Sequence, residues 1–330
     1  MHILQAKPEK IPLLYDFILL SGDISIDNIH FMKYNDRKSV LIKRKRKGEL
    51  QMYADYHLHT YYSDDSDYPM EQLVKDAVSI GLSEICFTDH VDYGVKEDWP
   101  DGPDTYQPEE KAALPAMNVK YPAYHTEIKQ IKRKYNGRIT IREGMEFGMQ
   151  VHTIPQYQKL FSSYPFDFII LSCHQVEDKE FWNQDFQKGK TQEEYNRRYY
   201  EEILRVIKRY KDYSVLGHLD MITRYDLAGI YPFEKVKDII TDILKQAISD
   251  GKGIEVNTSS HRYGLPDLTP SRDILKLYKE LGGTIITIGS DTHAPEHLAA
   301  YVKETAKELK QLGFSSICTF ENMAPVFHQL

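Results

Sequence analysis

The sequence predicts an α/β protein built as a parallel barrel of seven strand–helix units, similar to a TIM barrel. Short apolar runs rich in β-branched residues alternate with longer amphipathic segments from residue 53 to residue 312, which is typical of such barrels. Residues that suit metal binding follow almost every one of these runs. The carboxyl ends of barrel strands form the active site in this fold class, so this shared position predicts one polar site at that end.

The barrel elements are expected in alternation along the chain. We expect strands, in order, at residues 53–57, 85–88, 139–143 (continuing toward Glu146), 166–172, 214–217, 253–257 and 284–288. Apolar residues recur at helical spacing in six further segments. These segments are residues 70–80, 121–135, 191–209, 233–249, 271–281 and 295–312. Residues 92–117 are rich in Pro, Gly, Asp and Glu and are expected to form a long loop.

The bulk composition is that of a globular protein from a reducing compartment. The 330 residues suffice for one large barrel, and a hydrophobic content of 41% is ordinary for such a domain. A mean hydropathy of -0.52 argues against membrane spans, and no apolar run approaches the length that crosses a bilayer. Three widely spaced cysteines suggest no disulfide framework, so we expect a cytoplasmic protein.

Charge separates the first 51 residues from the rest of the chain. Residues 1–51 hold 10 Lys/Arg and 6 Asp/Glu, whereas the remainder holds 32 basic and 43 acidic residues. This acidic body gives no electrostatic footprint for nucleic acid. We expect residues 52–330 to form one barrel domain. Residues 1–51 are expected to be an N-terminal extension: a partly disordered tail, a basic localisation or nucleic-acid patch, or, as we favour, a translated leader before a start at Met52.

Six histidines follow the predicted strands: His57, His59, His90, His174, His218 and His293. His57 and His59 lie on one side of an extended chain, because strand side chains alternate, so both imidazoles can bind one divalent ion. Asp291 and His293 repeat this spacing. An isolated His-x-His is often a surface pair, and an isolated His174 or His218 is often a hydrogen-bonded core imidazole. The combined set favours metal ligation.

Glu146 is the carboxylate expected at the centre of the site. It lies between apolar residues and is flanked by glycines in Gly144-Met145-Glu146-Phe147-Gly148. A carboxylate can bridge two metals, which an imidazole cannot readily do. A surface acid on a turn is the alternative, and Glu143 on the same strand is a rival candidate with less suitable neighbours.

These motifs together resemble those of the PHP (polymerase and histidinol phosphatase) superfamily of metal-dependent phosphoesterases. His57-x-His59, Thr88-Asp89-His90, Glu146, His174, His218 and Asp291-x-His293 occur in the family's order. The resemblance covers essentially all of residues 52–330. Within the family, Glu255-Val256-Asn257-Thr258-Ser259 with Arg262, and the stretch from Ser290 to Glu296, are similar to the histidinol-phosphate phosphatases. The resemblance implies a distorted (β/α)7 barrel, the PHP fold.

The resemblance also implies three divalent metal ions, with Mn, Fe or Zn as candidates. The implied ligand sets are His57, His59, Glu146 and Asp291 for the first ion; Glu146, His174 and His218 for the second; and Asp65, His90 and His293 for the third. Asp64 is adjacent to Asp65, which leaves that assignment open. A turn carboxylate is the ordinary alternative for Asp65.

The activity implied by the resemblance is hydrolysis of a small phosphomonoester. The expected substrate is L-histidinol phosphate, which would give L-histidinol and phosphate in histidine biosynthesis. The expected catalytic residues are Glu146, Asp291, His293 and Asp89, of which Asp89 would either orient His90 or act near the leaving oxygen. Arg262 and Arg224 are the candidates for binding phosphate, with a surface salt bridge as the alternative for Arg224.

Two alternatives remain open at this point. A PHP-family enzyme could act on another small phosphomonoester or on phosphotyrosine, and a non-catalytic, metal-binding accessory domain would carry the same motifs. Amidohydrolase chemistry is disfavoured, because no lysine follows a predicted strand as a bridging ligand. The loop at residues 92–110, with Trp99 and Tyr106, is a solvated loop or part of a lid over the cationic groups of the substrate.

Overall fold

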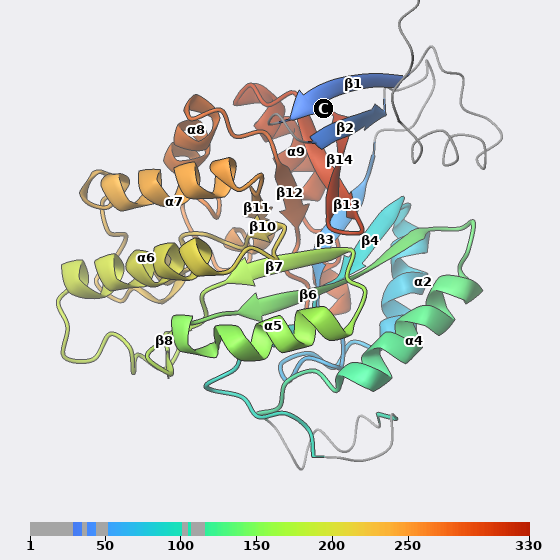
Figure 1. The fold of residues 1–330 in the computed structure, drawn as a ribbon, viewed down its shortest axis with the longest axis horizontal. Helices are drawn as coiled ribbons and strands as arrows, with labels where there is room; N and C mark the ends of the chain where they lie inside the picture. The colour runs from blue at the N-terminus through green and yellow to red at the C-terminus, as the bar shows by residue number, and fades with distance from the viewer. Residues whose placement is uncertain (1–28, 35–37, 44–51, 101–104, 107–115) are drawn as a thin grey trace, which may run out of the picture.

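Seven parallel strands form a nearly closed barrel, as the sequence predicts (Figure 1). The computed structural model describes residues 29–34, 38–43, 52–100, 105–106 and 116–330. The barrel strands are, in chain order, β3 (Ala54–Leu58), β4 (Glu84–Phe87), β6 (Thr140–Gly148), β7 (Phe168–Ser172), β10 (Val215–Leu216), β11 (Gly253–Asn257) and β12 (Ile286–Gly289). A parallel bridge between Leu58 and Thr292 joins the first strand to the segment after the last. A short strand, β5 (His90–Val91), also pairs with β6.

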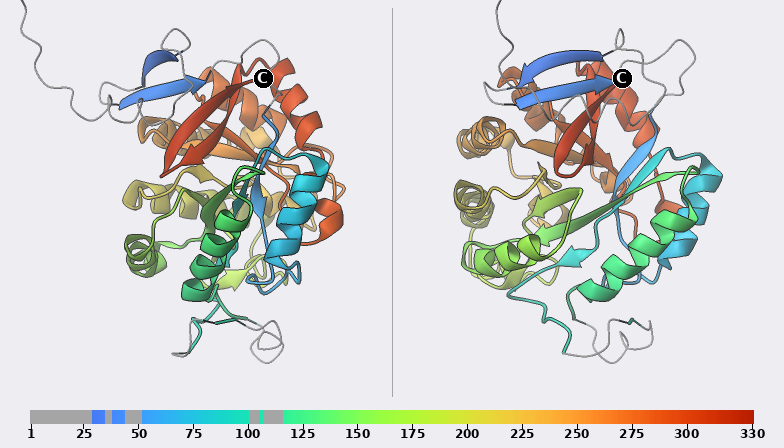
Figure 2. Two further views of the ribbon diagram at one scale, coloured as in Figure 1. Left: turned by 90° about the vertical axis from the view of Figure 1, so that its right-hand side faces the viewer. Right: turned by 45° about the vertical axis from the view of Figure 1, so that its right-hand side comes forward.

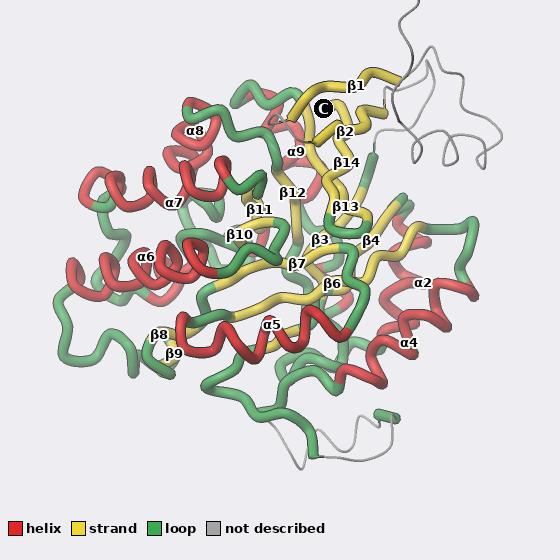
Figure 3. The backbone as a smooth tube through the Cα atoms, viewed as in Figure 1, coloured by secondary structure: helices red, strands yellow, loops and turns green. Residues whose placement is uncertain are grey.

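Helices surround this barrel (Figure 3). They are α2 (Met70–Ile80), α4 (Tyr121–Lys134), α5 (Ile154–Ser163), α6 (Gln192–Arg209), α7 (Lys237–Ser249), α8 (Arg272–Glu280) and α9 (Val302–Gln311). The longest, α6, begins at a capping box in which Thr191 and Glu194 satisfy each other's backbone N–H groups. Within the described residues, none of these helices is long and apolar enough to cross a membrane.

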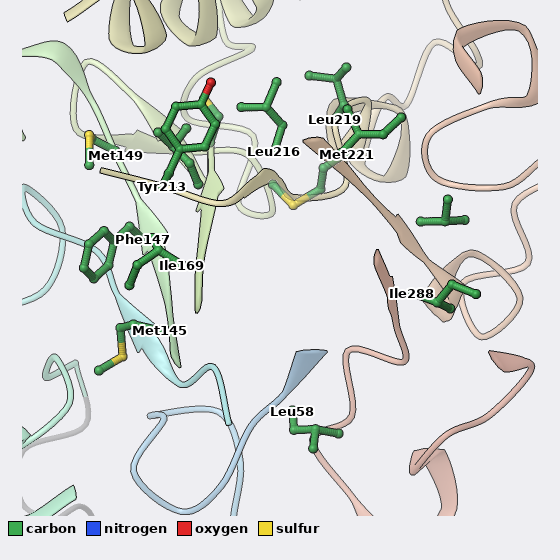
Figure 4. Close-up of a cluster of buried hydrophobic side chains, with 14 of the residues drawn as sticks. Leu58, Met145, Phe147, Met149, Ile169, Tyr213, Leu216, Leu219, Met221 and Ile288 are labelled. Carbon is green, nitrogen blue, oxygen red and sulfur yellow. The ribbon is translucent and has the colours of Figure 1, made fainter. Parts of the chain in front are cut away.

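Alternation along the strands separates the apolar core from the polar site. On β6, Met145 and Phe147 are fully buried and belong to the large hydrophobic cluster between barrel and helices. Met145 lies beside Ile169 of β7 in the strand register (Figure 4). Because neighbouring side chains on a strand face opposite ways, Glu146 points into the barrel. The same sequence stretch therefore supplies both packing and chemistry.

A C-terminal hairpin closes the amino end of the barrel. Its strands, β13 (Ser316–Glu321) and β14 (Ala324–Gln329), pair antiparallel. Phe320 packs against Phe168, with ring centroids 5.0 Å apart, and its backbone N–H donates to the Tyr56 hydroxyl at 2.8 Å. These residues form a second buried cluster, separate from the outer core.

Part of the predicted N-terminal extension joins this hairpin. Strands β1 (Ile29–Tyr34) and β2 (Lys38–Lys43) pair with each other, and β2 pairs with β14 (Figure 2). Residues 1–28, 35–37 and 44–51 lie outside the described residues. The division of the chain at residue 52 stays a prediction.

The structure corrects several expected elements. Helix α5 and the β13–β14 hairpin were not predicted, and neither was the small pair β8 (Gln175–Val176) and β9 (Lys179–Glu180). The helix expected at residues 295–312 divides into a 3-10 turn, Pro295–His297, and α9. Ala299 and Tyr301 adopt positive φ values of 54° and 60°, so a continuous right-handed helix is impossible there.

Candidate metal centre

The carboxyl ends of the barrel strands bring the predicted ligands into one cluster. The side chains come from β3, β5 and β6 and from the segments that follow β3, β7, β10 and β12. They are His57, His59, Asp65, His90, Glu146, His174, His218, Asp291 and His293. His57, His59 and Glu146 are fully buried. The structure thus brings all nine predicted ligand side chains together at one end of the barrel.

Glu146 lies between two groups of imidazoles. Its Oε2 atom is 3.0 Å from Nε2 of His57 and 3.5 Å from Nε2 of His59. Its Oε1 atom is 3.0 Å from Nε2 of His174 and 2.8 Å from Nε2 of His218. The Oε2 atom is also 3.0 Å from Nδ1 of His90. Each carboxylate oxygen therefore faces its own group of nitrogen donors, which is the arrangement of a bridging ligand.

The rival carboxylate Glu143 faces away from this cluster. Its Oε1 atom is 2.6 Å from Nδ1 of His125 and accepts a hydrogen bond from the Tyr121 hydroxyl at 3.1 Å. Both partners are on α4, outside the barrel. The odd-numbered register of Glu143 on β6 gives it the outer face, which supports Glu146 as the site residue.

A third group of donors lies around Asp65. Its Oδ2 atom is 3.1 Å from Nε2 of His293 and 3.6 Å from Nε2 of His90. The adjacent Asp64 instead accepts a hydrogen bond from Nζ of Lys96 at 2.6 Å. The two neighbouring carboxylates thus have different partners, and Asp65 is the one that joins the histidines.

The carboxylates of the cluster are held ionised, which suits a cation, while its imidazoles differ from one another. Burial alone would raise the pKa of Glu146, but the imidazoles of His57, His174 and His90 hold it well below its ordinary value. Asp291 behaves likewise, since burial is outweighed by His57, His59, His293 and Arg224. Burial, together with His293 and His90, lowers the pKa of His59 well below its ordinary value. Burial also lowers the pKa of His218, whereas nearby carboxylates outweigh burial and raise the pKa of His57, His90 and His174. Ionised carboxylates and neutral imidazoles are the forms that bind a divalent ion, so metal binding would release protons from these three rings.

The positions of the nitrogen and oxygen donors also fit a bound metal ion. Nε2 of His59 and Nδ1 of His218 are buried without a hydrogen-bond partner, which is costly for a polar atom unless something binds it. Ligand atoms within 4.8 Å of one another define four overlapping groups: His59, His90 and His293; His57, Glu146 and His218; His57, His59 and Asp291; His90, Asp92 and His174. Imidazoles mixed with carboxylates suit Zn, Mn or Fe.

Two carboxylates behind the cluster were not assigned a role from the sequence. Glu255 on β11 places Oε1 2.5 Å from Nδ1 of His57, and its Oε2 accepts from the His218 backbone N–H at 2.9 Å. Asp92 places Oδ1 2.7 Å from Nδ1 of His174. Such partners fix the ring orientation of metal-binding histidines. A charged residue inside an otherwise apolar strand was the available signal for Glu255.

The position of Asp89 differs from both expectations. Its Oδ1 atom accepts hydrogen bonds from the Thr60 backbone N–H at 2.7 Å and from the Ser63 hydroxyl at 2.8 Å. The Ser63 Oγ atom in turn is 3.1 Å from Nδ1 of His59. Asp89 is fully buried and is not among the residues that line the cavity. These contacts show that it holds the loop behind His59, and a catalytic role for Asp89 stays a prediction.

Both predicted arginines reach the site. A cavity of about 760 Å³ opens above the cluster, and Arg224 and Arg262 line it. A guanidinium nitrogen of Arg224 is 3.6 Å from Oδ2 of Asp291, and one of Arg262 donates to the Asp291 carbonyl oxygen at 2.9 Å. The Tyr263 ring lies 4.0 Å from Arg224 and 5.2 Å from Arg262. Two cations are therefore held beside the candidate metal centre.

The two aromatic residues of the long loop, Trp99 and Tyr106, do not line the cavity above the cluster. Tyr106 stacks on Tyr61 and Tyr62 and donates a hydrogen bond to the Tyr61 carbonyl oxygen at 2.6 Å. Trp99 donates to the Asn118 carbonyl oxygen and lines a separate cavity between the loop and helices α4 and α5. The described part of this loop thus gives no support to a substrate lid built on Trp99 and Tyr106.

Two backbone features at the end of β12 allow it to lie close to the cluster. A Cβ atom at Gly289 would overlap the Cβ of His57 and the Oε1 of Glu255. Asp291, two residues later, has a φ of 56°, a left-handed conformation that Asp tolerates better than most residues. With these two features, the end of β12 directs the Asp291 carboxylate toward His57 and His59 of the first strand segment.

Fold and site together define a class: a barrel protein with a buried histidine–carboxylate cluster, suited to divalent metals, at the carboxyl ends of its strands. Comparison with known proteins gives the family. The PHP domain matches residues 55–259. The chain belongs to the PHP family.

Individual relatives agree with this family. A histidinol-phosphatase from Lactococcus lactis is 30% identical over 82% of this chain and 94% of its own length. The crystal structure of histidinol phosphate phosphatase from the same organism, complexed with zinc, L-histidinol and phosphate, superposes with a TM-score of 0.68 at 29% identity, covering 83% of this chain and 98% of the other. A structure from Listeria monocytogenes, at 19% identity, has a TM-score of 0.58, covers 76% of this chain and 99% of its own, and supports the fold alone.

Proposed function

We propose that this protein is a metal-dependent histidinol-phosphatase, which hydrolyses L-histidinol phosphate to L-histidinol and phosphate. The observation that carries the proposal is Glu146, which faces imidazoles with both of its oxygens directly beneath a cavity lined by two arginines. The similarity to the Lactococcus lactis enzyme supports the choice of substrate. We further propose a cytoplasmic location, because the three cysteines are free and buried.

The residues that would hold divalent ions form three sets around Glu146. The sets are His57, His59, Glu146 and Asp291; Glu146, His174 and His218; and Asp65, His90 and His293. The distances between these side chains support each set. Manganese, iron and zinc are the candidate ions. Bound there, such ions would supply Lewis acidity and lower the pKa of water, so that it can act as a nucleophile near neutral pH.

The side chains around the cavity have separate tasks in this reaction. Arg224 and Arg262 would hold the phosphoryl oxygens, because a guanidinium matches their geometry and its charge offsets theirs. Glu255 and Asp92 would keep His57 and His174 in one ring orientation. A bond between phosphorus and the water oxygen forms, the bond between phosphorus and the substrate's alcohol oxygen breaks, and that oxygen takes a proton.

The decisive experiment is phosphate release from L-histidinol phosphate by manganese-loaded protein, measured beside sugar phosphates, nucleotides and phosphotyrosine. We expect a clear preference for L-histidinol phosphate and loss of activity after chelation, with recovery on adding a divalent ion. Turnover of other esters alone would discard the substrate. Failure with every ester, despite bound metal, would favour the accessory-domain alternative.

A further inference from the structure

We propose that Glu180 and Trp182 form the subsite that binds the cationic leaving group, and that they set the preference for an amine-bearing phosphomonoester. This inference deepens the proposed function and rests on it. Both residues line the cavity above the candidate metal centre, together with Arg224 and Arg262. The cavity of about 760 Å³ has ample room for the alcohol part of the ester beyond the phosphoryl group.

The local fold fixes both side chains beside the cluster. Strands β8 and β9 form an antiparallel pair in which Glu180 lies opposite Gln175, and Gln175 follows the candidate ligand His174 directly. Directly opposed residues on antiparallel strands have Cα atoms about 5 Å apart. Glu180 is therefore held close to the metal centre by backbone pairing rather than by a flexible loop.

Phe181 explains why its two neighbours face the cavity. Phe181 is 1% exposed and packs against Phe186 and Tyr199, with ring centroids 5.2 Å and 5.5 Å away. Trp182, the next residue, is 65% exposed. The buried phenylalanine anchors the segment, and the side chains before and after it are directed away from the core. An indole at the mouth of a polar cavity offers a face to a cation or to a flat ring.

The charges in the cavity are divided between its walls. Among the acids that line it, Asp64 and Asp92 contact Lys96 at 2.6 and 2.9 Å, and Asp65 and Asp291 face the histidines. In the described part of the chain, the Glu180 carboxylate has only an amide as a side-chain partner, Asn183 at 3.4 Å. A carboxylate without a cation, in the same cavity as two arginines, suits a substrate that is anionic at one end and cationic at the other.

The test compares substrates that differ at the leaving group. Steady-state kinetics would be measured with L-histidinol phosphate, O-phosphoethanolamine and phenyl phosphate, whose leaving group carries no cationic group, using metal-loaded full-length protein. Glu180→Gln should lower kcat/KM for the two amine-bearing esters by about 10-fold to 100-fold, the size of a charge-assisted hydrogen bond, and change phenyl phosphate hydrolysis by no more than about twofold. Trp182→Leu should raise KM for L-histidinol phosphate, and Trp182→Phe should restore most of the affinity.

Glu177 provides the matched control. It lies on the same hairpin but pairs with Arg198 at 3.2 Å, outside the cavity, so Glu177→Gln should leave the preference unchanged. An equal loss of kcat/KM for all three esters in Glu180→Gln, or no loss for any, would overturn the inference. A wild-type enzyme that prefers O-phosphoethanolamine but rejects L-histidinol phosphate would refute the proposed substrate, while loss of that preference in Glu180→Gln would still support the subsite.

Discussion

At the scale of single residues, the cluster depends on carboxylates that hold the histidines from behind. Glu255 uses both oxygens, one toward the His57 ring and one toward the His218 backbone N–H. A buried carboxylate in this position offers two acceptors that no other described side chain supplies to these two groups. The sequence pointed to the histidines through their repeated spacing, but Glu255 carried no such repeat and its role emerged only from the contacts.

We predict that Glu255→Gln weakens metal binding by about 10-fold to 100-fold, because the amide cannot accept at both atoms. Metal content per chain after dialysis and kcat/KM would both be measured. Glu234, whose side chain is 76% exposed, gives the control Glu234→Gln, which should match the wild type. Wild-type metal content and activity in Glu255→Gln would show that His57 needs no such partner.

At the scale of elements, strand ends decide the site, and backbone spacing decides whether the strands can approach. The end of β12 contacts both β11 and β3, and Gly289 lies there in close contact with His57 and Glu255. Gly253, at the start of β11, is equally crowded, but its neighbour there is Ile285, far along the barrel from the cluster. A comparison of substitutions at these two glycines therefore separates an effect on barrel packing from an effect on the metal site.

We predict that Gly289→Ala and Gly253→Ala both destabilise the fold by about 1–3 kcal/mol, the usual cost of overpacking. Only Gly289→Ala should also lower metal affinity, because its Cβ displaces His57 and Glu255. Urea unfolding of the metal-free proteins and metal titration would be compared. Equal metal affinity in the two variants would argue that β12 can shift without disturbing the ligands.

Some helices and strands could be predicted from sequence patterns, and others could not. Residues 70–80 were predicted and observed as α2, because their apolar positions repeat at helical spacing and Gly81, with a φ of 83°, ends the helix. Helix α5 was missed because it is short and contains Pro155, although proline is well tolerated in a first helical turn. The β13–β14 hairpin was missed because its strands follow the last barrel unit and break the α/β alternation.

At the scale of the whole molecule, the two ends of the barrel have opposite roles. The carboxyl ends of the strands carry the polar cluster, and the amino ends are closed by an apolar plug around Phe320. Phe320 is 2% exposed and contacts Phe168 inside the barrel. The plug supports the strands without touching the cavity, as expected where one end of a barrel serves stability and the other catalysis.

We predict that Phe320→Ala lowers the free energy of unfolding by about 3–5 kcal/mol, with KM and metal affinity unchanged in the fraction that remains folded. Chemical denaturation followed by circular dichroism would measure the loss. Leu227, which is 83% exposed, provides Leu227→Ala as a control, expected within about 0.5 kcal/mol of the wild type. A stable Phe320→Ala protein would mean that the hairpin is dispensable for the barrel.

The sequence by itself determined the barrel, because local periodicity of 2 and 3.6 residues marks strands and helices, and a parallel sheet forces their carboxyl ends to one side. It also predicted which nine side chains would converge there. Only the tertiary structure decided which partner each carboxylate takes: Asp64 with Lys96, Asp65 with His293, Asp89 with Thr60 and Ser63, and Glu255 with His57. Those pairings depend on distances between strands and loops far apart in the chain, which no local pattern encodes.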